Sequence, residues 1–155
     1  MADVLTVAEY ILSKTGYVST MKLQKLAFYS NALSLVEYGT PLFPERFQAW
    51  VNGPVCRELF QAHRGKFIIG PGELGASPGG LARDARARAC VDKTVDVLGD
   101  YEGNDLSSLT HAEDPWRDAR RGCGERDRCD AVISDEDIRA FYSSPKCTNP
   151  LFLAA

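Results

Sequence analysis

The longest uninterrupted segment with apolar residues at helical spacing runs from Met21 to Tyr38. Apolar and small side chains at positions 23, 26, 27, 30 and 33 fall on one side of a helix, and aromatic residues extend the apolar surface around much of its circumference. Ser19 or Thr20 can cap the start of this helix, and Gly39 is the residue type that ends a helix in the left-handed conformation. The pattern therefore predicts a central helix that is buried on most sides.

Shorter helical patterns lie on either side of this segment. Thr6 and Glu9 have the spacing of a capping box, which predicts a helix that runs to about Lys14. Ser134 is predicted to cap the last helix, and a run of acidic residues follows it. Further helices are predicted over residues 56–63, 81–98, 116–121 and 135–142, with a short one after Asp105.

One region favours strands instead. Apolar and polar or small residues alternate from Phe47 to Val51, which predicts a short strand, and residues 52–54 (Asn-Gly-Pro) force a turn. Residues 66–69 are expected to pair with this strand. The predicted fold is therefore mainly α: a compact helical domain around a central buried helix, with a small β element.

The chain is predicted to divide into a domain over residues 1–142 and a flexible tail over residues 143–155. Its 155 residues suit one domain with a sizeable core. Residues 70–80 are rich in glycine and proline, which is typical of a flexible surface loop. The tail ends in Leu-Ala-Ala, which resembles the end of a bacterial tag read by an unfoldase-linked protease. A chance apolar terminus is the favoured alternative to a degradation signal.

Composition narrows the class of protein further. The formal net charge is -3, so the chain as a whole lacks the excess of basic residues that a general nucleic-acid binder carries. No apolar run has the length needed to cross a bilayer, and the first residues lack the layout of a signal peptide. The five cysteines are widely spread with no Cys-x-x-Cys pair, which favours reduced thiols in a cytosol over a disulfide framework. A cytoplasmic protein without membrane contact is expected.

Candidate chemical sites are sparse. Cys123 and Cys129 could supply thiolates to zinc, but free thiols fit their spacing better. Cys56 and His63 lie about two helical turns apart, which is too far for a nucleophile and its base on one helix. Residues 110–113 (Thr-His-Ala-Glu) favour a local hydrogen-bonded structure. Neither a catalytic residue nor a cofactor or metal ligand set is therefore predicted.

Two arginine clusters bear on nucleic-acid binding. One spans residues 83–88 and the other spans residues 117–128, and acidic residues are interleaved with both. A solvated helix face is the favoured interpretation, although arginine also favours protein interfaces.

Several motifs, in chain order, resemble one known family. They are Met21-Lys-Leu-Gln-Lys-Leu26, Tyr38-Gly-x-Pro-Leu-Phe43, Trp50-x-x-Gly-Pro-Val55, Leu106-x-x-Leu-Thr-His111 with x-x-x-Pro115-Trp116-x-x-Ala119-Arg120, and Ile133-x-x-Glu136-Asp-Ile138 with x-x-Phe141-Tyr142. This set is similar to the signature of the Panacea domain of SocA-like antitoxins. The match runs from about Val4 to Tyr142, and the sequence departs from it in residues 70–80, in residues 123–129 and in the tail.

The resemblance implies a bacterial or prophage antitoxin that neutralises a toxin encoded beside it through direct protein contact. It also implies a second role, as an adaptor that presents a toxin to a cytosolic protease. Because the same domain is paired with chemically different toxins, the family does not identify the toxin. No catalytic residue or cofactor is part of the family's pattern, so the protein is expected not to be an enzyme.

Five polar or aromatic positions in these motifs are the candidate partner contacts: Trp50, Asn52, His111, Glu113 and Trp116. Two alternatives stay open beside the antitoxin. One is a DNA-binding autoregulator of its operon, against which the interleaved charges argue. The other is a small hydrolase that uses His111 and Glu113, or a zinc protein that uses the two cysteines of residues 123–129.

Overall fold

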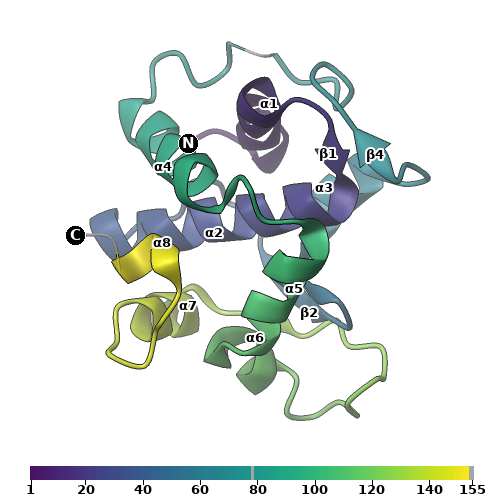
Figure 1. Cartoon of the computed structure of the whole chain (residues 1–155), viewed down its shortest axis with the longest axis vertical. Coiled ribbons are helices and arrows are strands. Elements are labelled where there is room, and N and C mark those ends of the chain that lie inside the picture. The colour runs from purple at the N-terminus through teal and green to yellow at the C-terminus, as the bar shows by residue number, and fades with distance from the viewer. Residues whose placement is uncertain (78, 154–155) are drawn as a thin grey trace.

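The computed structural model describes residues 1–77 and 79–153. Within them are eight helices and five short strands, and one of the helices lies at the centre of the others (Figure 1). The helices are α1 (Val4–Thr15), α2 (Thr20–Tyr38), α3 (Arg57–His63), α4 (Ala85–Leu98), α5 (Gly103–His111), α6 (Asp114–Ala119), α7 (Asp135–Tyr142) and α8 (Pro150–Leu153). The strands are β1 (Val18–Ser19), β2 (Phe47–Trp50), β3 (Gly53–Cys56), β4 (Ile68–Ile69) and β5 (Val132–Ile133). Helix covers 52% of the described residues and strand 9%, which confirms the predicted mainly α fold.

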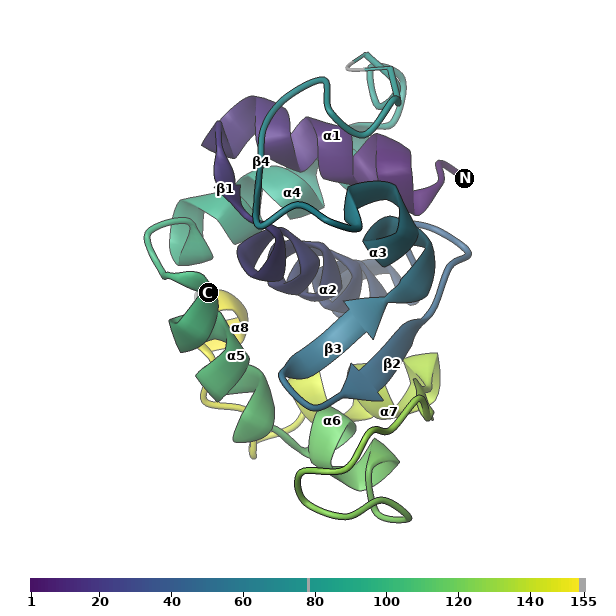
Figure 2. The same ribbon diagram turned by 90° about the vertical axis from the view of Figure 1, so that its right-hand side faces the viewer.

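Helix α2 is the centre of the fold, as its apolar pattern predicts. Its start is capped by the Ser19 hydroxyl, which accepts from the Lys22 N–H at 3.1 Å, and Gly39 ends it with a φ of 74°. Every side chain from Leu23 to Leu35 is buried, so the helix has no solvent face along these turns. Helices α1 and α4 lie on one side of α2, and α5, α6 and α7 lie on the other (Figures 1 and 2).

The strands form two small sheets. Strands β2 and β3 make a hairpin with Trp50 opposite Gly53, and β5 adds to the other edge of β2. Strand β4 pairs with β1, with Ile69 opposite Val18, so the prediction that residues 66–69 pair with the strand at 47–51 is wrong. After α3 the chain returns to the start of α2, where the Thr20 N–H donates to the Phe67 carbonyl at 2.9 Å.

Some helix ends differ from the sequence-based expectations. Helix α1 begins at Val4 because Asp3 caps it and accepts from the Thr6 N–H at 2.8 Å. The predicted capping box is wrong, because the Glu9 carboxylate instead accepts from the Gly72 and Leu74 N–H groups at 2.9 Å. This buried carboxylate ties the glycine-rich segment to α1. Helix α4 begins after its cap at Asp84, four residues later than predicted.

The C-terminal segment lies on the domain as far as Leu153. Cys147, Asn149 and Leu151 are buried, and the Phe152 ring stacks on Tyr142 with 4.6 Å between centroids. The two alanines of the Leu-Ala-Ala end lie outside the described residues, and its action as a degradation signal stays a prediction.

Two side chains of α2 bind the main chain of β3. The Gln24 amide accepts from the Cys56 N–H at 2.9 Å and donates to the Cys56 carbonyl at 3.2 Å. The Lys25 ammonium donates to the Pro54 carbonyl at 3.0 Å. These are the groups that a further strand would pair with, so α2 covers the outer edge of the sheet and leaves no free strand edge there.

Replacement of Gln24 by alanine is expected to lower the free energy of unfolding by about 3 kcal/mol, because both buried groups of Cys56 lose their partner. Chemical denaturation measures the difference. Gln61→Ala, an exposed change on α3, is the control and should leave stability within about 0.5 kcal/mol of the unmodified protein. Equal stability of the two variants would show that the bonds to β3 do not support the fold.

Candidate functional site

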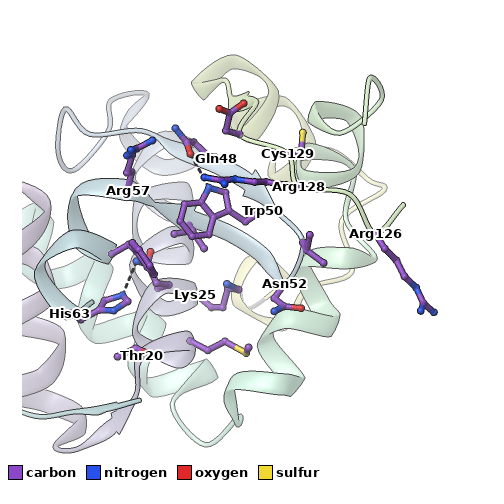
Figure 3. Close-up of a pocket in the computed structure, with 16 residues that line it drawn as sticks. Thr20, Lys25, Gln48, Trp50, Asn52, Arg57, His63, Arg126, Arg128 and Cys129 are labelled. Atoms are coloured by element: carbon purple, nitrogen blue, oxygen red, sulfur yellow. Dashed lines mark hydrogen bonds between the residues drawn. The ribbon is translucent and has the colours of Figure 1, made fainter. Parts of the chain in front are cut away.

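A groove of about 620 Å³ opens between the start of α2, the β2–β3 hairpin, α3 and the loop of residues 124–130 (Figure 3). It is within the size range of small ligand sites in proteins. Its lining residues are Thr20, Met21, Gln24, Lys25, Gln48, Trp50, Val51, Asn52, Val55, Arg57, Phe60, His63, Arg126, Arg128, Cys129 and Asp130.

The floor of the groove is mainly apolar. The Trp50 and Phe60 rings meet edge to face with 5.0 Å between centroids, and Val55 and Met21 extend this surface. The Trp50 indole N–H donates to the Gln48 side-chain oxygen at 2.8 Å, which fixes the ring's orientation. Because side chains alternate along β2, Gln48 and Trp50 face the groove while the other two residues of the strand enter the core.

Arginines stand at the rim. Arg57 and Arg128 lie on either side of Trp50, whereas Arg126 points away from the groove (Figure 3). Within residues 1–77 and 79–153, none of the three makes an ion pair. Asp130 is the one acidic side chain among the lining residues. The local charge is therefore positive on a chain whose net charge is negative.

The loop that forms the outer wall is organised by Arg120. Its buried guanidinium donates to the carbonyls of Gly124 at 2.9 Å and Asp127 at 2.7 Å, and to the Ala49 carbonyl of β2 at 2.8 Å. One cation thus shapes the loop and attaches it to the sheet.

A disulfide joins Cys123 to Cys129 across this loop, with 6.0 Å between their Cα atoms. The prediction of free thiols is therefore wrong for this pair, and the same bond occupies the sulfurs that the zinc alternative requires. Sequence spacing alone did not show the turn that brings the two residues together. Cys56, Cys90 and Cys147 are free and buried.

Lys25 is fully buried beneath the groove. Burial without a carboxylate partner lowers the pKa of its ammonium group to about 7. The backbone next to it is crowded: Gly53 has a φ of 114°, and a Cβ there would lie 2.6 Å from the Lys25 Cε and 2.9 Å from the Thr110 hydroxyl oxygen. Both the positive φ and the lack of space for a Cβ therefore require glycine at position 53.

The structure divides the five predicted contact residues into three groups. Trp50 and Asn52 line the groove. Trp116 lies behind the hairpin, where its indole N–H donates to the Trp50 carbonyl at 2.7 Å, and His111 stacks on Trp116 with 4.1 Å between ring centroids. Desolvation lowers the pKa of His111. Neither side chain lines the groove, and Trp116 supports the hairpin through this hydrogen bond.

Glu113 lies in the interior. One carboxylate oxygen accepts from the Tyr29 and Tyr142 hydroxyls at 2.6 and 2.7 Å, and the other accepts from the Asn149 amide at 2.9 Å. Burial raises the pKa of Glu113 and these hydrogen bonds oppose the rise. The carboxylate joins α2, α7 and the C-terminal segment, and its burial keeps it from direct contact with a partner.

Gln48, Arg57, Phe60 and Arg128 shape the groove and were not among the predicted contact residues. Gln48 shares a face with Trp50 at strand spacing, and Arg57 and Phe60 share a face at helical spacing, so these three could have been found from the pattern. Nothing in the sequence placed Arg128, because its position depends on the path of the loop.

Lys25 generates a pH-dependent prediction. Its pKa is about 7 in the fold and 10.5 as a free group, so the unfolded chain binds more protons between these values and the free energy of unfolding rises with pH across that window. The lysine contributes a rise of about 2 kcal/mol between about pH 7 and about pH 9. Denaturation of Lys25→Met at both pH values should lack this rise, while the control Lys22→Met on the same helix should retain it. A Lys25→Met variant with the unmodified protein's pH dependence would contradict the assignment.

Arg120→Met should release the loop of residues 121–131. Loss of its main-chain bonds is expected to cost about 2 kcal/mol or more in unfolding free energy, and to speed hydrogen exchange in this segment. Arg121→Met is the matched control, because Arg121 is exposed and bonded to Asp118. Unchanged exchange in the loop would show that the disulfide alone holds it.

No helix among the described residues is both long and apolar enough to cross a bilayer.

Comparison with known proteins gives two matches. Residues 23–71 match the family described as Antitoxin SocA-like, Panacea domain. The chain is also 28% identical over 152 residues to Antitoxin SocA of Caulobacter vibrioides (strain NA1000 / CB15N), a match that covers 86% of this chain and 81% of that protein. No solved structure gives a significant match. The resemblance seen in the motifs is thereby confirmed: this chain is similar to SocA-like antitoxins with a Panacea domain over most of its length.

Proposed function

We propose that the protein is an antitoxin that neutralises a cognate toxin by direct binding, and that the groove is part of the contact surface. The observation that carries this proposal is that most residues lining the groove belong to the segment that matches the antitoxin family. Of its sixteen lining residues, ten lie within residues 23–71, the stretch that matches the antitoxin family. A groove built largely by the family's own segment is suited to a shared binding role.

The chemistry of the groove supports a protein partner. Tryptophan and arginine are the residue types that most often dominate binding energy at protein interfaces. Trp50 supplies a half-buried aromatic surface, and Arg57 and Arg128 supply cations without ion pairs among the described residues. Val51 and Asn52 are exposed at the hairpin turn beside them.

The groove also argues for binding rather than catalysis. His63 lies at its margin, but its Nε2 lies 3.0 Å from the Gln24 amide nitrogen, so this atom is occupied as an acceptor. Burial raises the pKa of the Cys56 thiol to about 12, which keeps the thiol protonated and unreactive. Similarity to an antitoxin favours the same non-enzymatic role.

Three of the five arginines of residues 117–128 are already bound within the fold, which leaves only Arg126 and Arg128 to support the DNA-binding alternative. Arg117 pairs with Asp114 at 2.7 Å, Arg121 pairs with Asp118 at 3.1 Å, and Arg120 is committed to main-chain carbonyls. Phosphate binding needs cations that are free to replace counterions. We therefore keep toxin binding as the proposed function, with a cytoplasmic location and an adaptor role toward a protease as further parts of the proposal.

Co-expression with the neighbouring reading frame tests the function. The neighbour's product is expected to stop growth when expressed alone and to be harmless beside this chain, with the two proteins copurifying. Val51→Asp places a charge at the exposed edge of the groove and should abolish protection without lowering the melting temperature. Tyr38→Ala, a change of an exposed aromatic residue at the far end of α2, should protect fully. A harmless neighbour and no copurifying protein would refute the antitoxin proposal.

A further inference from the structure

The groove combines an apolar floor with a cationic rim, and this combination restricts what it can hold. Arg57 projects from the first turn of α3 and Arg128 from the loop, and the Trp50 ring lies between them (Figure 3). A ligand that reaches both arginines therefore crosses the indole. Guanidinium ions bind anionic groups such as carboxylates and phosphates through paired hydrogen bonds.

Both edges of the β2–β3 hairpin beside the groove are occupied. Gln24 and Lys25 occupy the edge of β3, and on the other side of β2 the Ala49 N–H donates to the Ala131 carbonyl at 2.9 Å. A peptide in the groove therefore does not pair with either edge of the hairpin through its backbone. Recognition in the groove then depends on side chains that enter it.

We propose that the groove binds an extended acidic segment of a protein partner, with an Asp or Glu carboxylate between Arg57 and Arg128 and a neighbouring apolar side chain on Trp50 and Phe60. The identification of that partner as the toxin rests on the proposed function. The volume of about 620 Å³ holds a few side chains rather than the face of a domain. The groove is thus an anchor point within a larger contact.

A nucleic acid is a poorer occupant. The chain carries a net charge of -3, and Asp130 stands in the lining of the groove beside the arginines. Glu125 and Asp127 are exposed on the same loop. A polyanion would meet these carboxylates along its length, whereas one or two acidic side chains can be placed between the arginines.

A first experiment is independent of any toxin. The full chain is immobilised and exposed to a library of random twelve-residue peptides displayed on phage. Enriched peptides are expected to carry Asp or Glu next to an aromatic or aliphatic residue, and to bind less tightly as salt is raised from about 0.05 M to about 0.5 M. The double variant Arg57→Glu/Arg128→Glu should bind the selected peptides at least about tenfold more weakly.

The control is Arg83→Glu/Arg86→Glu, which changes the net charge equally at exposed arginines outside the groove lining. It should bind the peptides as the unmodified protein does. Enrichment of peptides without acidic residues, no enrichment at all, or equal loss in both double variants would overturn the proposal. Preferential capture of a random-sequence DNA duplex through the same two arginines would also overturn it.

The second experiment uses the neighbour's product in cells. Arg57→Glu/Arg128→Glu should lose protection, and selection for its return should yield toxin variants in which an Asp or Glu has become Lys or Arg. If the unmodified protein protects and this double variant protects equally, the acidic-segment proposal fails and the antitoxin proposal stands. If the unmodified protein does not protect, the antitoxin proposal fails, and the peptide selection alone decides the chemistry of the groove.

Discussion

The attachment of β3 to α2 through two polar side chains is the constraint on which the candidate site depends. A helix that is buried on all sides must satisfy every polar group it carries, and α2 carries Gln24 and Lys25 among its apolar residues. Both are satisfied by the main chain of one strand. These hydrogen bonds hold the hairpin against the core helix in one register. If β3 shifted by one residue, the main-chain groups of Cys56 and the side-chain amide of Gln24 would lose their partners.

The motifs that identify the family meet at this attachment. Gly53 lies against the side chains of Lys25 and Thr110, and the hairpin is supported further by the bond from Trp116 to the Trp50 carbonyl. Segments from the first and second halves of the chain thus converge on one turn. Most of these positions build the hairpin, and only the side chains on its open face are available to a partner.

Local patterns predicted more of the fold than of the site. The burial of α2, its Ser19 cap and its Gly39 end follow from spacing and from residue type, and the β2–β3 turn follows from Asn-Gly-Pro. Long-range pairings did not follow. The β1–β4 pair, the contact of Glu9 with residues 72 and 74, and the disulfide all join segments whose proximity depends on the path of the intervening chain. Of the five predicted contact positions, Trp50 and Asn52 line the groove, and both follow from the local strand and turn pattern. The burial of Glu113 depends instead on long-range bonds with Tyr29 and Asn149.

The way Arg120 holds the outer wall of the groove has a consequence for which substitutions the loop can accept. The guanidinium bonds only main-chain oxygens, so the path of the loop does not depend on which side chains residues 124–128 carry. Substitutions at the exposed positions of the loop alter the surface offered to a partner while the scaffold underneath stays the same. Under the proposed function, a change of partner specificity therefore requires substitutions in one short segment and no matching change in the core.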